Sequence, residues 1–242
     1  MANILLPLLR KLESESRLAD EEREAVLNIP FTIRELRVDE DIVRDKDHPS
    51  QSCLLIHGWL CRYKILARGQ RQILSFHMAG EIPDLQSLFL KTMDHNLACA
   101  TEAKVAFIQH DSIKRLISTF PRLGEILWRE TLIDAAIFRE WITGMGCRQA
   151  PERIAHLFCE LFTRMGVVGL AEADRFRFPL TQSALGDALG VSAVHVNRSL
   201  MDLRSQGLIT LGRQIVTIPD WERLKQYAGF DPSYLHLVKA AD

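Results

Sequence analysis

One stretch, residues 180–209, constrains the fold more than any other part of the chain. It reads as two short helices separated by a turn at Gly190, because glycine ends a helix in the left-handed conformation without a Cβ penalty. Thr181 and Ser192 stand where N-caps are needed, and apolar residues follow each of them at helical spacing. The pattern predicts a helix-turn-helix, in which the second helix enters the major groove of DNA.

Two features distinguish this pair from an ordinary pair of bundle helices. The second helix carries hydrogen-bonding side chains on the side away from its apolar positions. Residues 208–218 then read as two β-branched strands around Gly212, with Arg213 at the tip of a wing, where it suits a phosphate contact. We therefore expect double-stranded DNA as a partner. The residues expected to face it are Thr181, Gln182, Ser192, Ala193, Val194, His195, Asn197, Arg198 and Arg213.

The composition of the whole chain is that of an ordinary globular protein. With a net charge of −1 over 242 residues, any basic surface for nucleic acid must be local. No apolar run reaches the roughly 18 residues that a membrane span needs. The five cysteines are odd in number and irregularly spaced, which favours free thiols in a reducing compartment. We expect a cytoplasmic protein with no membrane association.

The first half of the chain changes from helical to β-type periodicity near residue 31. Residues 5–24 favour one or two short helices. Short stretches rich in β-branched and aromatic residues follow, at residues 31–38, 53–57, 59–66, 71–78, 97–100 and 103–109. Short strands at close intervals with polar turns predict an antiparallel roll or sandwich.

Helical periodicity returns at Asp111, breaks at Pro121 and then runs to Gly144. The long run has two apolar faces, whereas a surface helix has one, so two neighbours must cover it. We expect one neighbour to be the roll and the other to be the same helix of a second subunit in a parallel dimer. Burial of both faces within one chain is the alternative. The residues expected at the dimer interface are Ile126, Ile133, Ile137 and Trp141, and the second apolar face carries Trp128, Leu132, Ala135, Phe138 and Ile142.

The remaining segments complete an α+β fold class. A helix is expected from Pro151, then a hairpin over residues 166–179, and after the wing a short helix over residues 221–227 with an irregular tail over residues 229–242. The expected architecture is an N-terminal antiparallel β-roll of the jelly-roll type with N-terminal helices, a long dimerisation helix and a C-terminal winged helix-turn-helix. The expected boundaries are 1–119, 120–146 and 147–242.

This order of elements resembles the CRP/FNR family of bacterial transcription regulators. The resemblance covers nearly the whole chain and is strongest at residues 56–64, 73–89 and 185–209. It implies a homodimer that binds inverted-repeat operators with half-sites about 10–10.5 bp apart. It also implies a protein that contacts RNA polymerase and is not an enzyme.

The resemblance assigns the DNA-reading roles residue by residue. Ser192 opens the recognition helix, and Arg198 matches the family's DNA-reading arginine, whose guanidinium can bind guanine O6 and N7. Val194 stands where many members carry glutamate, and His195 where they carry threonine. Since valine cannot accept a hydrogen bond from cytosine, the half-site is expected to differ from the family's familiar ones.

The resemblance also implies an effector pocket, and there this chain departs from the family. Cyclic-AMP responders carry a Gly-Glu pair for the ribose and an Arg-Ser pair for the phosphate. Because no arginine stands at the matching positions to neutralise a cyclic phosphate, cyclic AMP is not expected. The pocket residues expected are Gly80, Asp84, Leu85, His95 and Asn96.

No cofactor or metal is predicted. No cysteine precedes Cys53, so the N-terminal cluster that holds an iron–sulfur centre in one branch of the family is missing. Haem stays open through His77 or His57, and His156 with Cys159 lacks the second pair that a metal site needs. The alternative function is a metal- or haem-dependent sensor or enzyme built on the roll. A regulator that senses nothing itself is a third possibility.

Overall fold

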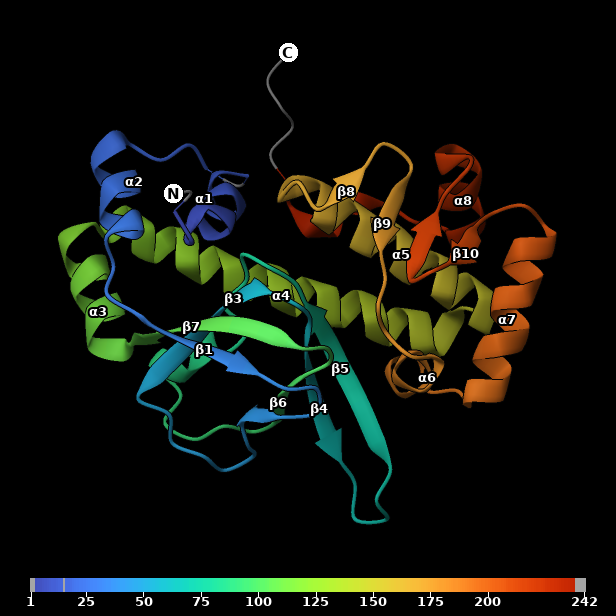
Figure 1. Ribbon diagram of the computed structural model, residues 1–242, viewed down its shortest axis with the longest axis horizontal. Helices are drawn as coiled ribbons and strands as arrows, with labels where there is room; N and C mark the ends of the chain where they lie inside the picture. Colours follow the sequence, from blue (N-terminus) through green and yellow to red (C-terminus); the bar gives the residue numbers. More distant parts are fainter. Residues whose placement is uncertain (1–2, 15, 238–242) are drawn as a thin grey trace.

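The computed structural model describes residues 3–14 and 16–237 (Figure 1). It begins with two short helices, α1 (Leu6–Glu13) and α2 (Asp20–Leu27), as the sequence predicts. Seven strands follow: β1 (Thr32–Leu36), β2 (Asp41–Val43), β3 (Gln51–His57), β4 (Leu60–Ile65), β5 (Arg71–His77), β6 (Asn96–Cys99) and β7 (Ala103–Gln109). A short 3₁₀ turn, η1 (Leu85–Leu88), lies between β5 and β6.

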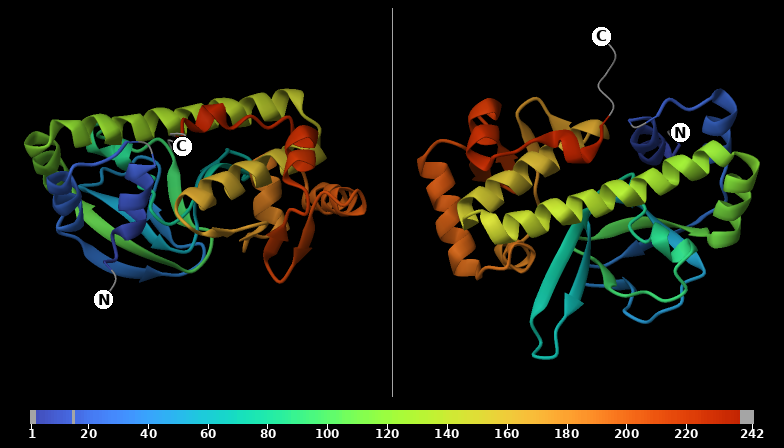
Figure 2. Two further views of the ribbon diagram at one scale, coloured as in Figure 1. Left: turned by 90° about the horizontal axis from the view of Figure 1, so that it is seen from above. Right: turned by 180° about the vertical axis from the view of Figure 1, so that it is seen from behind.

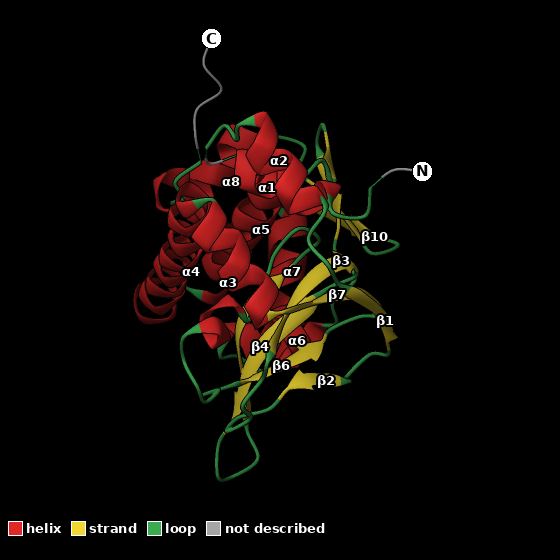
Figure 3. Cartoon of the chain, turned by 90° about the vertical axis from the view of Figure 1, so that its left-hand side faces the viewer, coloured by secondary structure: helices red, strands yellow, loops and turns green. Residues whose placement is uncertain are grey.

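The strands form the predicted antiparallel roll of two sheets, gathered at one end of the molecule in Figure 3. One sheet has the order β1-β7-β3 and the other the order β2-β6-β4-β5. Alternation along β3 explains why both of its faces are apolar. Cys53 and Leu55 pack inside the roll, whereas Leu54 packs with α1 residues on the outer side. The N-terminal helices therefore cover one face of the roll.

After α3 (His110–Thr119), the long helix α4 (Pro121–Cys147) crosses the back of the molecule from the roll to the C-terminal half (Figure 2, right). It ends at Cys147, later than the sequence predicts, because Gly144 and Gly146 are accommodated in its last turn. A glycine weakens a helix by only about 1 kcal/mol, so it does not oblige the helix to stop.

The isoleucine face of α4 is covered within the chain, and this corrects the predicted dimer interface. Ile126 packs with the N-terminal helices, and Ile133 and Ile137 pack in the main core; each is only 5% exposed. Trp141 is half-buried and donates from Nε1 to Glu160. For the three isoleucines the expected contact with a second subunit is therefore wrong, whereas for Trp141 it stays a prediction.

The second apolar face of α4 is the one that remains open. Trp128, Leu132 and Ile142 are 67%, 54% and 65% exposed. Periodicity separates two apolar faces of a helix but does not say which one points inward.

The C-terminal half contains the predicted winged helix-turn-helix. Its elements are α5 (Ala150–Val167), β8 (Ala171–Glu172), β9 (Arg175–Arg177), α6 (Gln182–Leu189), α7 (Ala193–Ser205), β10 (Thr210–Gly212), β11 (Ile215–Thr217), α8 (Trp221–Ala228) and η2 (Pro232–Leu235). The two hairpins join in one sheet of order β10-β11-β9-β8, so the upstream hairpin is part of the wing. Of the predicted irregular tail, residues 238–242 lie outside the described part.

One hydrophobic core joins the two halves. Trp59 and Phe76 of the roll pack with Phe158 and Phe178 of the C-terminal half. The ring centroids of Trp59 and Phe178 lie 6.1 Å apart in an edge-to-face arrangement, and those of Phe158 and Phe178 lie 5.1 Å apart.

No helix among residues 3–14 and 16–237 is long and apolar enough to cross a bilayer.

The wing turn contains two non-glycine residues in the left-handed region. Arg213 has φ 49° and Gln214 has φ 61°, as a two-residue type I′ hairpin turn requires. In the left-handed region a non-glycine residue raises the free energy of the folded state by about 1 kcal/mol. Replacing Gln214 with glycine is therefore expected to raise the free energy of unfolding by roughly 0.5–1 kcal/mol, measured by urea denaturation. The same change at Thr210, in strand β10, should destabilise; a Gln214→Gly protein no more stable than wild type would contradict the strain argument.

Candidate nucleic-acid interface and effector cavity

The two short helices are held at the angle of a helix-turn-helix by caps and by one close backbone approach. Thr181 Oγ1 accepts from the Ala184 amide at 3.1 Å, and Ser192 Oγ accepts from the His195 amide at 3.2 Å. A Cβ at Gly186 would lie 2.6 Å from the Val191 carbonyl, so only glycine permits this packing. The caps predicted from the sequence are therefore present.

The outer face of α7 is exposed and rich in hydrogen-bonding groups, at the right-hand edge of Figure 1. Val196, Leu200 and Leu203 bury the opposite face. Asn197 Nδ2 donates to Gln182 Oε1 at 3.2 Å, which links this face to α6. The predicted DNA-facing residues of both helices and the wing are exposed: Thr181, Gln182, Ser192, Ala193, Val194, His195, Asn197, Arg198 and Arg213.

Sequence reasoning missed one residue of this surface, Arg177 of β9. It is exposed and pairs in register with Ile215 of β11, next to the wing tip that carries Arg213. The neighbouring exposed arginine, Arg175, is engaged by Asp174 at 3.2 Å. The sequence pattern Arg-Phe-Arg-Phe over residues 175–178 could have revealed it. Successive residues of a strand point to opposite faces, so buried phenylalanines imply exposed arginines.

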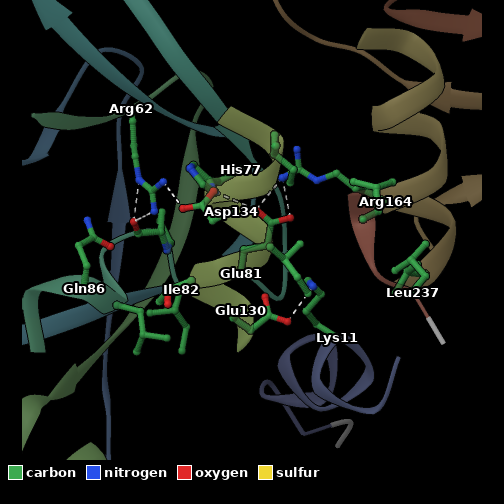
Figure 4. Close-up of a pocket in the computed structure, with 17 residues that line it drawn as sticks. Lys11, Arg62, His77, Glu81, Ile82, Gln86, Glu130, Asp134, Arg164 and Leu237 are labelled. Atoms are coloured by element: carbon green, nitrogen blue, oxygen red, sulfur yellow. Dashed lines mark hydrogen bonds and ion pairs between the residues drawn. The ribbon is translucent and has the colours of Figure 1, made fainter. Parts of the chain in front are cut away.

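A separate cavity of about 60 Å³ lies between the roll, α4 and α5, and its walls carry paired charges (Figure 4). Arg62 of β4 donates from Nε to the Pro83 carbonyl at 2.8 Å and forms an ion pair with Asp134 of α4. Lys11 of α1 pairs with Glu130 of α4 at 2.8 Å. These pairs fasten the roll and the first helix to the long helix.

Arg164 of α5 continues this network toward the C-terminal half. It lies 2.9 Å from Glu81 of the roll and 2.9 Å from Glu160 on its own helix, and both carboxylates are buried. Burial alone would raise the pKa of Glu81, but Arg164 and His77 hold that pKa below its usual range. The network therefore keeps a buried negative charge on the roll that binds the C-terminal half.

A larger cavity of about 390 Å³ lies beside the same stretch of α4. His95 stands in its wall, where burial and Arg62 lower the pKa of the imidazole. Residues of α4 form one wall of this cavity and residues of the roll form the other. The lining includes Arg62, Gln72, His95, Phe138, Trp141 and Ile142.

The five residues expected at an effector pocket are not all brought together. Leu85 lines the smaller cavity and His95 the larger one. Asp84 instead accepts from the Cys53 amide at 2.8 Å, Asn96 donates to the Tyr63 carbonyl, and Gly80 packs against the backbone of Pro7. Asp84, Asn96 and Gly80 line neither cavity, because their side chains or backbone hold the roll together.

The structure places the two histidines considered for haem in different surroundings. His77 contacts Glu81 through Nδ1 at 2.9 Å and Ser75 through Nε2 at 2.8 Å, and His57 is exposed at the end of β3. Over residues 3–14 and 16–237, no three or more His, Cys, Asp or Glu side chains are placed to hold a metal ion.

Comparison with known proteins identifies two domains in this order. Residues 33–120 match the family model of the cyclic nucleotide-binding domain, and residues 152–227 match that of the Crp-like helix-turn-helix domain. Electron transport regulator A of Shewanella oneidensis is 26% identical over 84% of this chain and 87% of its own. An anaerobic regulatory protein of Haemophilus influenzae is 26% identical over 88% of each chain.

Solved structures share the fold. The structure of FixK2 from Bradyrhizobium japonicum superposes with a TM-score of 0.75, at 23% identity, over 82% of this chain and 98% of its own. A regulator from Xanthomonas campestris, CLP, described as responsive to c-di-GMP, superposes with a TM-score of 0.63 at 16% identity, over 83% of this chain and 99% of its own.

Asp84 is a buried carboxyl whose ionisation opposes folding. Burial raises the pKa of Asp84 to about 7, although the hydrogen bond from the Cys53 amide and the charge of Arg62 each lower it. Between the ordinary pKa near 4 and about 7, the folded state binds a proton that the unfolded state releases, so stability falls as pH rises through this window. We expect Asp84→Asn to remove this fall and to be more stable than wild type at pH 8 by roughly 2–4 kcal/mol.

Urea denaturation of both proteins from pH 5 to pH 8 tests this expectation. Asp45→Asn, at an exposed carboxylate, is the matched control and should leave the pH dependence unchanged. A difference between Asp84→Asn and wild type that does not vary with pH would show that Asp84 is not protonated in the folded protein.

Proposed function

Because the chain belongs to the CRP/FNR family of transcription regulators, we propose that it binds inverted-repeat operator DNA as a homodimer and thereby controls transcription. The observation that carries this proposal is the exposed polar face of α7, capped by Ser192 and flanked by the wing. Each α7 enters one major groove, and the two half-sites lie about one helical turn apart. The protein acts in the cytoplasm, contacts RNA polymerase and catalyses no reaction.

The roles of the DNA-facing residues follow from their chemistry. Arg198 reads guanine through two hydrogen bonds, and Val194, which is 70% exposed, packs on a thymine methyl group. Arg213 at the wing tip and Arg177 beside it bind phosphates, which set the position of the protein without reading sequence. A glutamate at position 194 would prefer cytosine, so Val194 shifts the operator away from that sequence.

The open face of α4 is the dimer seam of this proposal. Trp128, Leu132 and Ile142 lie on one side of the helix and are more than half exposed. Three large apolar side chains along one helix face are costly to leave in water, at about 25 cal/mol per Å² of apolar surface. Packing α4 against α4 of a second copy buries them and places the two winged halves symmetrically.

The sensory mechanism of the proposal does not involve cyclic nucleotides or an iron–sulfur cluster. Arg62 lines the same cavity as His95, and its guanidinium is already bound by Asp134 and the Pro83 carbonyl. A cyclic phosphate would have to displace the half-buried Asp134 carboxylate from the buried Arg62 side chain, which is unfavourable. The larger cavity, with His95 in its wall, is the place where a different small effector would enter.

Ile142→Glu is expected to separate the dimer into monomers, because it buries a charge in the apolar seam. Sedimentation velocity measures the change. Ile65→Glu makes the same substitution at the end of β4, where the isoleucine is 58% exposed, and it should leave the dimer intact. Equal dissociation by both variants, or a wild-type protein that sediments as a monomer, would contradict the assignment of the seam.

Arg198→Ala and Arg213→Ala are expected to weaken DNA binding in different ways. Arg198→Ala should cost roughly 1–3 kcal/mol on the selected operator and leave binding to random DNA nearly unchanged. Arg213→Ala should weaken both and reduce the slope of affinity against salt by about one. Fluorescence anisotropy on operators obtained by in vitro selection measures both effects.

Arg175→Ala serves as the control for loss of an exposed arginine near the wing, since Arg175 is held by Asp174. It should change neither the operator preference nor the salt slope appreciably. If Arg198→Ala weakens operator and random DNA equally, Arg198 does not read a base.

A further inference from the structure

A small cavity lies at the junction where α4 turns into α5, beneath the end of α6. Its volume is about 20 Å³, the size of one water molecule or one monatomic ion. Both charged and apolar residues line it. It includes Glu140, Arg148, Arg153, His156, Ala188 and Leu189.

Three buried nitrogen atoms of this lining have no hydrogen-bond partner among the described residues: Arg148 Nη1, Arg153 Nε and His156 Nε2. The His156 side chain is 7% exposed, and its ring stacks on Tyr234 at 5.9 Å, which fixes its direction. Its Nε2 lies 3.3 Å from Glu140 Oε1, without the geometry of a hydrogen bond. Buried polar groups are almost always paired, so three in one place indicate a missing ligand.

One other nitrogen of each arginine is already hydrogen-bonded, and this fixes the direction of both side chains. Arg148 Nη2 donates to Glu140 at 2.7 Å, and Arg153 Nη1 donates to the Leu189 carbonyl at 2.6 Å. The free Nη1 and Nε atoms therefore cannot turn toward solvent without breaking these bonds. The cavity is preorganised.

The occupant must accept hydrogen bonds, because guanidinium nitrogens only donate. The charged groups around the cavity are two arginines and one carboxylate, Glu140. His156 adds no charge at pH 7, since burial and Arg148 lower its pKa to about 4. The surroundings are therefore net positive, and the volume matches one small ion.

We propose that the α4–α5 junction binds one monatomic anion, chloride in the cell, between Arg148, Arg153 and His156. The site connects the long helix to the helix-turn-helix, because Arg153 also holds the Leu189 carbonyl where α6 ends. Gln72 of the roll donates to the neighbouring Ala188 carbonyl at 3.2 Å. A bound anion therefore stabilises the packing of the C-terminal half on the rest of the chain. This inference does not depend on the proposed DNA binding.

The first test is thermal unfolding of the full chain at constant sodium concentration, with chloride replacing glutamate, an anion too large for the cavity. The melting temperature of wild type should rise and saturate with chloride. Glu140→Gln removes the one carboxylate among the described lining residues, so half of the rise should occur at a chloride concentration roughly fivefold lower. Arg148→Met should abolish the saturable rise.

Arg68→Met removes an exposed arginine from the β4–β5 loop and should respond to chloride as wild type does. The second test is anomalous diffraction from crystals soaked in bromide, which should show a peak between Arg148, Arg153 and His156. If the site holds only water, the bromide crystals show no peak there, and Glu140→Gln responds to chloride as wild type does. Either result overturns the proposal. If Arg148→Met fails to fold, Glu140→Gln and the bromide crystals still decide it.

Discussion

The packing of roll aromatics against the C-terminal half is the interaction on which the arrangement of the whole chain depends. Trp59 and Phe76 of the roll share a core with Phe158 and Phe178. Arg164 adds a buried ion pair to Glu81 across the same boundary, 2.9 Å long. Removing either partner of such a pair leaves an uncompensated buried charge. These contacts therefore hold the helix-turn-helix half in one position relative to the roll.

Local sequence signals located the elements well, because each depends on residues close together in the chain. The left-handed Gly190, the caps at Thr181 and Ser192, and Pro151 in the first turn of α5 all appear where the sequence places them. The strand β2, only three residues long, left no readable periodicity. The sequence also did not predict that the two hairpins join in one sheet, because neither hairpin's sequence indicates which other strand it pairs with.

The candidate sites were harder to predict, since they depend on contacts between distant segments. The two apolar faces of α4 are equally visible in sequence, and only the folded chain shows that Ile133 and Ile137 point inward. In the sensory region, the family resemblance placed Asp84 in an effector pocket, whereas its carboxyl group accepts a hydrogen bond from the Cys53 amide. Nothing local links Arg62 to Asp134, which is 72 residues away.

The shared aromatic core has a consequence for how such regulators diversify. Many two-domain proteins evolve by exchanging one domain for another, which works when the boundary between them is polar and loosely packed. Here, grafting this winged half onto a foreign roll would leave Phe158 and Phe178 without Trp59, and the foreign roll would offer nothing shaped to receive them. The two halves can therefore change only together, one compensating substitution at a time.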